Sequence, residues 1–261
     1  MRYRLGISTC PNDTFMFHGL MTGRVDTRGL EFDVTLCDIQ ELNHGMEQER
    51  FDLCKASAFA ALQGAERRSV CDSGAALGYG VGPLLLRRPG APALGEGARV
   101  LCPGESTTAA ALFRHFFPEC REIRHVVFSE IMPALIATRA DYGVVIHEGR
   151  FTYQGCGLGC VADLGSLWEQ KYSLPLPLGC IVARKDLPEE VRPIFERVVR
   201  DSIEYGYQHC EETLITMRQY AQELSDEALW AHVDLYVNQW SLALGEEGRS
   251  AFEALGESLM R

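Results

Sequence analysis

The first third of the chain alternates short apolar runs with segments whose apolar positions recur at helical spacing. The runs RLGIS, LEFDVTL and DLCKAS are predicted strands, and the segments near 14–22 and 39–49 are predicted helices. Strands that alternate with helices are typical of an α/β fold with a largely parallel sheet.

A Pro/Gly-rich stretch, PGAPALGEGA at residues 89–98, interrupts the alternation. The pattern then predicts strand, helix, strand, helix and strand over RVLCP, 106–117, IRHVVF, 129–138 and YGVVIH. Another Pro/Gly cluster, SLPLPLG at 173–179, precedes the apolar run CIVAR. Beyond it the pattern is almost wholly helical, with helix-start patterns at Asp186 and Ser225.

Two such clusters indicate that the chain crosses twice between two lobes. We expect a discontinuous first lobe of residues 1–88 plus 180–261 and a second lobe of residues 89–179.

A faint internal repeat agrees with two lobes. An offset of 89 positions aligns FDLCKAS with ADYGVVIHE and brings Ser57 beside His147. Because ligands bind beyond the carboxyl ends of strands in open α/β sheets, we expect these two strand ends to face one another across a cleft.

Composition narrows the function classes. The 261 residues are 46% hydrophobic and 23% charged, with a formal net charge of −11 and no block of Lys and Arg, which disfavours a nucleic-acid partner. The N-terminal stretch lacks a signal-peptide pattern, and no segment approaches eighteen uncharged apolar residues. We therefore expect a cytoplasmic protein without a membrane partner.

Cysteines and glycines give no cofactor signature. The ten cysteines form no C-x-x-C pair, so reduced thiols are expected, and CGLGC at 156–160 fits a glycine-rich loop better than a zinc site. GYGVG and GCGLG do not match the dinucleotide pattern G-x-G-x-x-G. No metal and no nicotinamide or flavin cofactor are expected.

The segment STCPNDTF, residues 8–15, is a polar turn between a strand and a helix. Asn12 or Asp13 is suited to cap the helix, and the free backbone N–H groups are suited to hold a ligand oxygen. An ordinary helix start explains the same residues equally well. Cys10 is a candidate reactive thiol, although small buried cysteines are commoner.

Two further strand-to-helix junctions carry hydroxyl groups. In PGESTTAAALF, Ser106, Thr107 and Thr108 exceed what capping needs, which favours a site for a carboxylate or hydroxyl. In CKASAFAAL, Ser57 lies at a strand exit and Lys55 is suited either to neutralise an acidic substrate or to lie at the surface. Neither segment matches a P-loop or the G-x-S-x-G elbow of hydrolases.

His147 differs from the other histidines because it ends a strongly apolar strand. His18, His115, His209 and His232 lie in helical patterns, which favours structural or solvent-facing roles. An imidazole that titrates near neutral pH suits a general base, and Glu148 or Tyr153 is suited to orient it. A hydrogen-bonded histidine at the start of a loop is the competing interpretation.

Four motifs resemble one known family. CPNDTFMFHGL at 10–20, FDLCKAS at 51–57, GYGVGPLL at 78–85 and IHEGRFTY at 146–153 are similar to segments of the 1,4-dihydroxy-6-naphthoate synthases of the futalosine route to menaquinone. Thr9 stands where the family often has proline. The resemblance implies a two-lobed, periplasmic-binding-protein-like (type II) α/β fold with a cleft between the lobes and a helical C-terminal tail.

The resemblance also implies a reaction and a site. Cyclic dehypoxanthine futalosine would be split into 1,4-dihydroxy-6-naphthoate and dihydroxyacetone by a carbon–carbon lyase that needs no cofactor, with His147 as the base. The expected substrate-binding residues are Cys10, Asn12, Asn43, Lys55, Ala56, Ser57, Thr107 and Thr108.

Two alternatives stay open. Chorismate dehydratase of the same pathway shares the fold, and a solute-binding protein would use the same two lobes to capture a small acid. The HEGR and CPNDTF motifs favour the synthase. The candidate partners are a small carboxylate substrate and, in a homodimer, a second copy of the chain.

Overall fold

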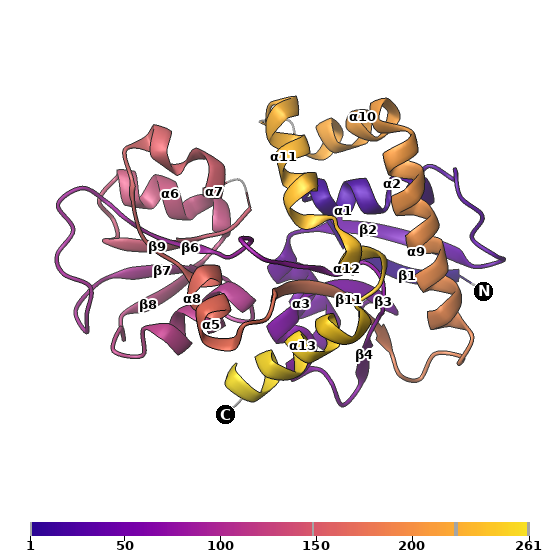
Figure 1. The fold of residues 1–261 in the computed structure, drawn as a ribbon, viewed down its shortest axis with the longest axis horizontal. Helices are drawn as coiled ribbons and strands as arrows, with labels where there is room; N and C mark the ends of the chain where they lie inside the picture. Colours follow the sequence, from indigo (N-terminus) through magenta and orange to yellow (C-terminus); the bar gives the residue numbers. More distant parts are fainter. Residues whose placement is uncertain (1, 148, 222–223, 260–261) are drawn as a thin grey trace.

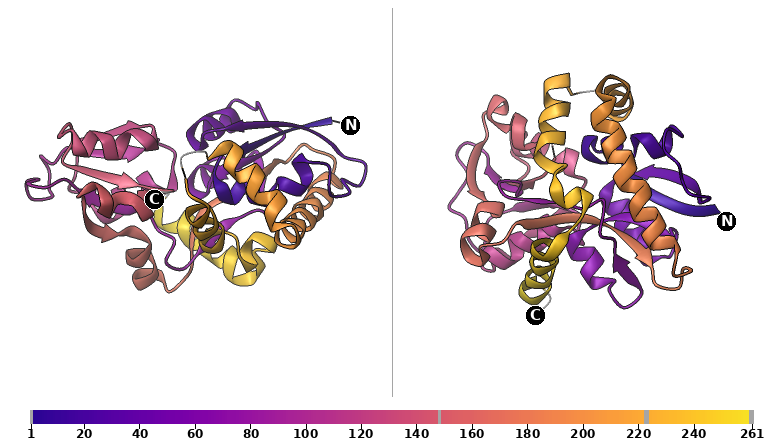
Figure 2. Two further views of the ribbon diagram at one scale, coloured as in Figure 1. Left: turned by 90° about the horizontal axis from the view of Figure 1, so that it is seen from above. Right: turned by 45° about the vertical axis from the view of Figure 1, so that its right-hand side comes forward.

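The computed structural model describes residues 2–147, 149–221 and 224–259, and these residues form two α/β lobes. The lobes lie side by side in Figure 1 and remain separate when seen from above in Figure 2. The chain passes from the first lobe to the second and back before its C-terminal helices, which lie on the first lobe.

The first sheet has the order β2-β1-β3-β11-β4, with β5 also paired to β11. Its strands are β1 (Arg2–Ser8), β2 (Glu31–Cys37), β3 (Leu53–Ser57), β4 (Arg68–Val70), β5 (Ala76–Gly78) and β11 (Leu176–Arg184). The expected parallel pairing holds for β1 with β2 and β3. Strand β11 is antiparallel to its neighbours because it enters from the other lobe.

The second sheet has the order β10-β6-β9-β7-β8. Its strands are β6 (Leu84–Arg87), β7 (Val100–Pro103), β8 (Ile123–Val126), β9 (Tyr142–Val145) and β10 (Gly159–Asp163). Strand β7 runs parallel to β8 and β9, whereas β6 is antiparallel to β9 and β10. The carboxyl ends of β7 and β9 therefore lie at the same edge of the sheet.

The crossings differ from the expected boundaries at 88/89 and 179/180. Strand β6, assigned from the sequence to the first lobe, pairs in the second sheet, and residues 176–179, assigned to the second lobe, pair in the first sheet. The Pro/Gly stretch 89–98 is instead a loop that follows β6 inside the second lobe. Proline and glycine mark both kinds of loop, so composition alone did not separate them.

Helices cover both lobes. The first lobe carries α1 (Pro11–Met16), α2 (His18–Met21), α3 (Ile39–Glu47) and α4 (Ala58–Gln63). The second lobe carries α5 (Thr108–Phe116), α6 (Phe128–Ile136), α7 (Gly149–Thr152), the 3-10 helix η1 (Tyr153–Cys156) and α8 (Leu164–Tyr172). The C-terminal helices are α9 (Val191–Gln208), α10 (Cys210–Tyr220), α11 (Asp226–Tyr236), α12 (Gln239–Leu242) and α13 (Gly245–Leu259).

One of the two expected C-terminal helix starts is confirmed. The Ser225 side chain caps α11 by accepting a hydrogen bond from the Ala228 amide. The expected start at Asp186 is wrong, since α9 begins at Val191. Asp186 instead accepts a hydrogen bond of 2.8 Å from Arg184, so its side chain is engaged by the preceding strand.

The C-terminal helices hold the short α1 in place. Six residues are too few for a helix that is stable by itself. Phe15 and Met16 of α1 are fully buried, in one hydrophobic cluster with Val199 and Ile203 of α9 and Met217 of α10. Packing against these later helices therefore fixes the turn that precedes α1.

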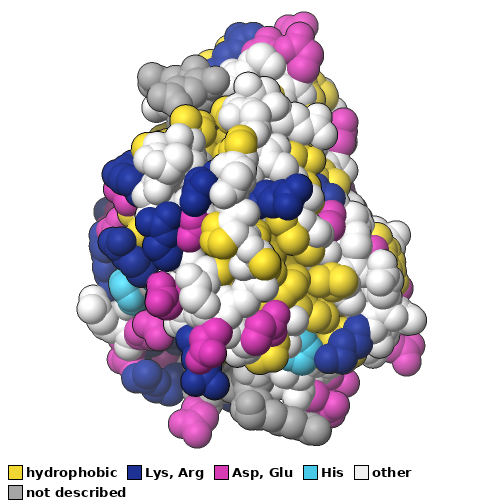
Figure 3. All heavy atoms as spheres, turned by 90° about the vertical axis from the view of Figure 1, so that its left-hand side faces the viewer, with side chains coloured by type: hydrophobic (Ala, Val, Ile, Leu, Met, Phe, Trp, Pro, Cys, Tyr) yellow, Lys and Arg dark blue, Asp and Glu magenta, His cyan; other side chains and the backbone are white. Residues whose placement is uncertain are grey.

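No helix in the described part of the chain is long and apolar enough to cross a membrane. Figure 3 shows the outer face of the second lobe, where basic and acidic side chains surround a group of hydrophobic ones. This face therefore presents both signs of charge.

Candidate active site between the lobes

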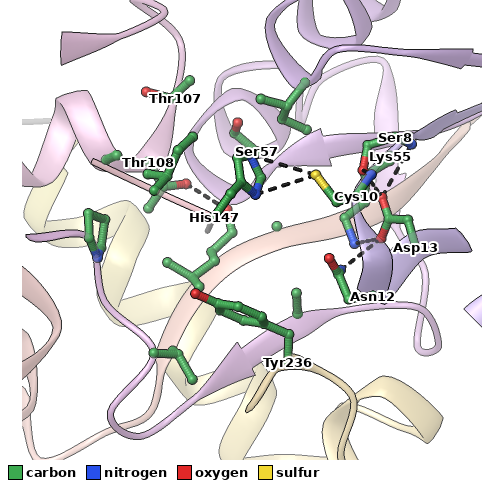
Figure 4. Close-up of a pocket in the computed structure, with 18 of the residues that line it drawn as sticks. Ser8, Cys10, Asn12, Asp13, Lys55, Ser57, Thr107, Thr108, His147 and Tyr236 are labelled. Carbon is green, nitrogen blue, oxygen red and sulfur yellow. Dashed lines mark hydrogen bonds and ion pairs between the residues drawn. The ribbon is translucent and has the colours of Figure 1, made fainter. Parts of the chain in front are cut away.

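A pocket lies between the lobes where several strands end and helices begin (Figure 4). The first lobe contributes the ends of β1 and β3, the start of α1, and parts of β5, β11 and α11. The second lobe contributes the first turn of α5 and the residues after β9. Among the described residues, the polar and titratable ones that line it are Ser8, Cys10, Asn12, Asp13, Lys55, Ser57, Thr107, Thr108, His147, Arg150, His232 and Tyr236.

His147 lies in the pocket with a strained backbone. Its φ of 54° is in the left-handed region, which costs a non-glycine residue about 1–2 kcal/mol. Its Nδ1 atom is 3.4 Å from the Sγ atom of Cys10, on the first lobe. The edge of the Phe128 ring also packs against the imidazole, at 4.8 Å between centroids. Strain of this kind at a residue that also lines a pocket favours a base over a histidine that only packs.

Of the two residues expected to orient His147, the structure describes only Tyr153. Glu148 lies outside the described residues. Tyr153 is in the 3-10 helix, where its hydroxyl accepts a hydrogen bond of 3.2 Å from Gln154. The contacts of His147 include those with Cys10, Phe128 and His232.

The turn before α1 is built around Asp13. Cys10 is the N-cap, and in the described residues no side chain caps this helix, so the expected capping by Asn12 or Asp13 is wrong. The fully buried Asp13 carboxylate accepts hydrogen bonds from Ser8 Oγ and Lys55 Nζ, both at 2.6 Å, and from Asn12 Nδ2 at 3.0 Å. Desolvation makes a buried carboxylate costly unless such donors surround it.

Lys55 is 4% exposed, so the alternative of a surface charge is wrong. Its ammonium group is already paired with Asp13, which leaves little uncompensated charge for an acidic substrate. Side chains alternate along β3, so Lys55 and Ser57 line the pocket while Ala56 packs in the hydrophobic core. Ala56 therefore does not supply a pocket side chain.

Asn43 acts on the pocket through Ser57. Its Nδ2 donates to Ser57 Oγ at 3.0 Å, and its Oδ1 accepts from the Ser57 amide at 2.9 Å. Asn43 is fully buried behind the pocket lining. The structure thus makes it a support for Ser57 and not the direct ligand contact that was expected.

The threonine hydroxyls of α5 are used within the protein. Thr107 caps α5 and donates to the Pro103 carbonyl at 2.5 Å. Thr108 Oγ1 accepts from the Phe59 amide at 3.1 Å and donates to the Leu178 carbonyl at 2.9 Å. Both threonines line the pocket, but the proton of each hydroxyl is already donated within the protein, and the start of α5 also offers the pocket its N-terminal amides. Ser106 lines a separate hollow.

Arg150 and His232 were missed as pocket residues. Arg150, in the HEGR motif, donates to the Gly82 carbonyl at 2.6 Å and to Asp163 at 2.7 Å. The prediction that His232 lies in a helix is confirmed, and its side chain is 1% exposed. No local signal places His232 at the pocket, because the helix that carries it arrives from the far end of the chain.

In the part of the chain that the structure describes, no group of three or more His, Cys, Asp or Glu side chains is arranged to hold a metal ion.

Comparison with known proteins identifies the family. The family model described as "Menaquinone biosynthesis" matches residues 3–260. The chain is 45% identical to a protein of Thermus thermophilus named "1,4-dihydroxy-6-naphtoate synthase", over 97% of this chain and 92% of that protein. It is 37% identical to a protein of the same name from Streptomyces coelicolor, over 97% and 90%.

Solved structures agree on the fold. A protein from Archaeoglobus fulgidus superposes with a TM-score of 0.92 at 30% identity, covering 98% of this chain and 96% of that one. The periplasmic aliphatic sulphonate binding protein of Escherichia coli gives a TM-score of 0.66 at 10% identity, covering 98% and 85%, which shows a periplasmic-binding-protein-like fold. The chain thus has this fold and belongs to the 1,4-dihydroxy-6-naphthoate synthase family of menaquinone biosynthesis.

Proposed function

We propose that this chain converts cyclic dehypoxanthine futalosine into 1,4-dihydroxy-6-naphthoate and dihydroxyacetone, with His147 as general base. The observation that carries the proposal is the strained His147 backbone, which holds the imidazole in the pocket within 3.4 Å of Cys10 on the opposite lobe. The name shared by the two relatives supports the product.

The charges of the pocket support an anionic substrate held by backbone groups. Among the described residues, its cations Lys55 and Arg150 are paired with Asp13 and Asp163. The positive end of α5 faces the pocket through Thr108 and Ala109. Amide groups in the first turn of a helix have no intrahelical partner and stabilise a carboxylate. We therefore assign the substrate carboxylate to this helix start.

The first lobe supplies polar groups for the polyol part of the substrate. Ser57 is held by Asn43, and Asn12 is held by Asp13, so both present fixed hydrogen-bonding groups. Fixed donors and acceptors position a substrate without the entropic cost of ordering them during the reaction.

The reaction is a carbon–carbon cleavage of retro-aldol type. His147 accepts a proton from a hydroxyl or an acidic C–H of the substrate, and the electron pair released drives the cleavage. The pair from the broken bond passes into the ring system, which becomes the aromatic naphthalene diol. Closure of the lobes excludes water during this step.

The test is turnover of cyclic dehypoxanthine futalosine by the purified protein, followed by absorbance and mass of the naphthoate. Replacing His147 by Asn removes the base, and we expect turnover to fall about 10²- to 10⁴-fold while substrate binding is retained. Ser166→Ala, on α8 outside the pocket, is the matched control and should keep full turnover.

Three results would overturn the proposal. Near-normal turnover by His147→Asn would show that His147 is not the general base. Turnover of a chorismate-derived substrate by the wild-type protein, without turnover of the futalosine derivative, would favour the dehydratase. Binding of small acids with no turnover of either substrate would favour a solute-binding protein.

A further inference from the structure

His232 faces the His147 ring from the opposite lobe. It lies on α11, is 1% exposed and lines the pocket. The two imidazole rings are nearly parallel, at 16°, with centroids 6.2 Å apart. Tyr236, one helical turn further along α11, packs against the His232 ring, with the ring centroids 4.6 Å apart. His232 is thus held firmly beside the residue proposed as base.

The hydrogen-bond network determines the tautomer of His232. The Asp13 carboxylate only accepts hydrogen bonds, so Asn12 must present its Nδ2 group to it, at 3.0 Å. The Asn12 Oδ1 atom is then the group that faces His232 Nε2, at 3.2 Å. Because an amide oxygen only accepts, Nε2 carries the proton. Nδ1 is left unprotonated and has no hydrogen-bond partner among the described residues.

The same surroundings keep His232 neutral. Burial, together with the nearby His147 and Lys55, lowers the pKa of His232 to about 3. Among the described residues, the other titratable and charged groups that line the shared pocket are Cys10, Asp13, Lys55, His147, Arg150 and Tyr236. Asp13 is the one carboxylate in this set, and Lys55 already neutralises it.

We propose that His232 is a positioning residue for His147, acting as a neutral imidazole of fixed tautomer that holds the catalytic ring when the lobes are closed. This inference rests on the proposed function, since it takes His147 as the base. A neutral neighbour lets His147 accept a proton without a like charge 6.2 Å away. It also supplies a polar surface that an aliphatic side chain lacks.

The test compares His232→Leu with His232→Gln. Glutamine can donate to Asn12 Oδ1 and stays neutral, whereas leucine leaves that oxygen unpaired and surrounds His147 with apolar atoms. For His232→Leu we expect kcat to fall about 10- to 100-fold with KM within about threefold of wild type, by analogy with residues that orient catalytic ligands. The acidic limb of its kcat/KM profile should move to lower pH, because an apolar neighbour disfavours the imidazolium. His232→Gln should stay within about threefold of wild type in kcat.

Equal losses in the two variants, or an unchanged kcat and pH profile in His232→Leu, would overturn the inference. Nitrogen NMR of the wild-type protein gives a second readout that needs neither turnover nor a folded variant. We expect His232 to show a protonated Nε2 and an unprotonated Nδ1 throughout the neutral pH range. Titration in that range, or the opposite tautomer, would refute the inference even if the synthase activity is established. Absence of turnover in the wild type would instead refute the proposed function.

Discussion

Asp13 and His232 illustrate how single residues of this pocket are stabilised. Asp13 has donors from Ser8, Asn12 and Lys55, so its burial is compensated by charge and hydrogen bonds. His232 is compensated only in its neutral form, since in the described residues its buried Nδ1 has no acceptor for a second proton. The two residues therefore respond differently to acid.

We expect His232 to make the folded protein sensitive to mild acid. Its pKa is lowered to about 3 in the folded state and returns to about 6.5 on unfolding, so the unfolded chain binds the extra proton. Stability is therefore full above pH 6.5 and falls as the pH decreases towards 3, by about 1 kcal/mol per pH unit from this group.

Urea unfolding of wild type and His232→Gln between pH 7 and pH 4 measures this effect. The slopes of the two proteins should differ by about 1 kcal/mol per pH unit below pH 6, because glutamine does not titrate. The acidic residues of both proteins protonate alike and cancel in the comparison. Parallel curves would show that His232 does not titrate between the folded and unfolded states in this way.

At the scale of elements, the segment in which the chain first crosses between the lobes, which contains Gly82, packs tightly against the start of α8. Asp163 caps α8 through the amides of Gly165 and Ser166. Arg150 bridges Asp163 and the carbonyl of Gly82. Gly82 and Gly165 approach so closely that a Cβ atom on Gly82 would lie 2.1 Å from the Gly165 amide nitrogen. The pocket wall at this point depends on that close approach.

Gly82→Ala should therefore lower the free energy of unfolding by more than about 2 kcal/mol, since backbone atoms must move to admit the methyl group. Gly95→Ala is the matched control: a Cβ atom there meets nothing within 4 Å, and the change should stay within about 0.5 kcal/mol. Thermal or urea unfolding measures both. Equal stability of the two variants would contradict the tight packing of Gly82 against Gly165.

Across the whole molecule, the lobes are joined by polar contacts at the pocket as well as by the crossing strands. Thr108 of the second lobe bonds Phe59 and Leu178 of the first, and Cys10 of the first lobe meets His147 of the second. These contacts join the two lobes at the pocket. The arrangement of the lobes is therefore stabilised by groups that also line the site.

Thr108→Val should weaken that arrangement. Valine keeps the shape but leaves the Phe59 amide and the Leu178 carbonyl unpaired, at a cost of about 1–3 kcal/mol. The apparent Kd for substrate should rise, because a smaller fraction of molecules is in the binding-competent state. Thr108→Ser keeps the hydroxyl and serves as control. Unfolding and substrate titration test both variants, and identical values for Val and Ser would argue against the role of the hydroxyl.

Local pattern predicted the strands β1, β2, β3, β7, β8 and β9 and the helices α3, α5 and α6. It also located the polar strand exits at Cys10, Ser57, Thr107 and His147, since side-chain periodicity is a property of neighbouring residues. The local pattern did not show which polar groups already have hydrogen-bond or ion-pair partners inside the protein. The hydroxyl of Thr108 is engaged by residues 49 and 70 positions away, and Lys55 is paired with Asp13.

Long-range packing decided the remainder of the site. His232 contacts Asn12, which is 220 positions away in the sequence, and faces His147 across the cleft. The sequence of its helix predicts only that the segment is helical and not which residues it contacts. Hydrogen bonding and burial depend on which segments meet in space, and therefore only the folded chain shows His147 strained, in contact with Cys10, and facing a second, neutral imidazole.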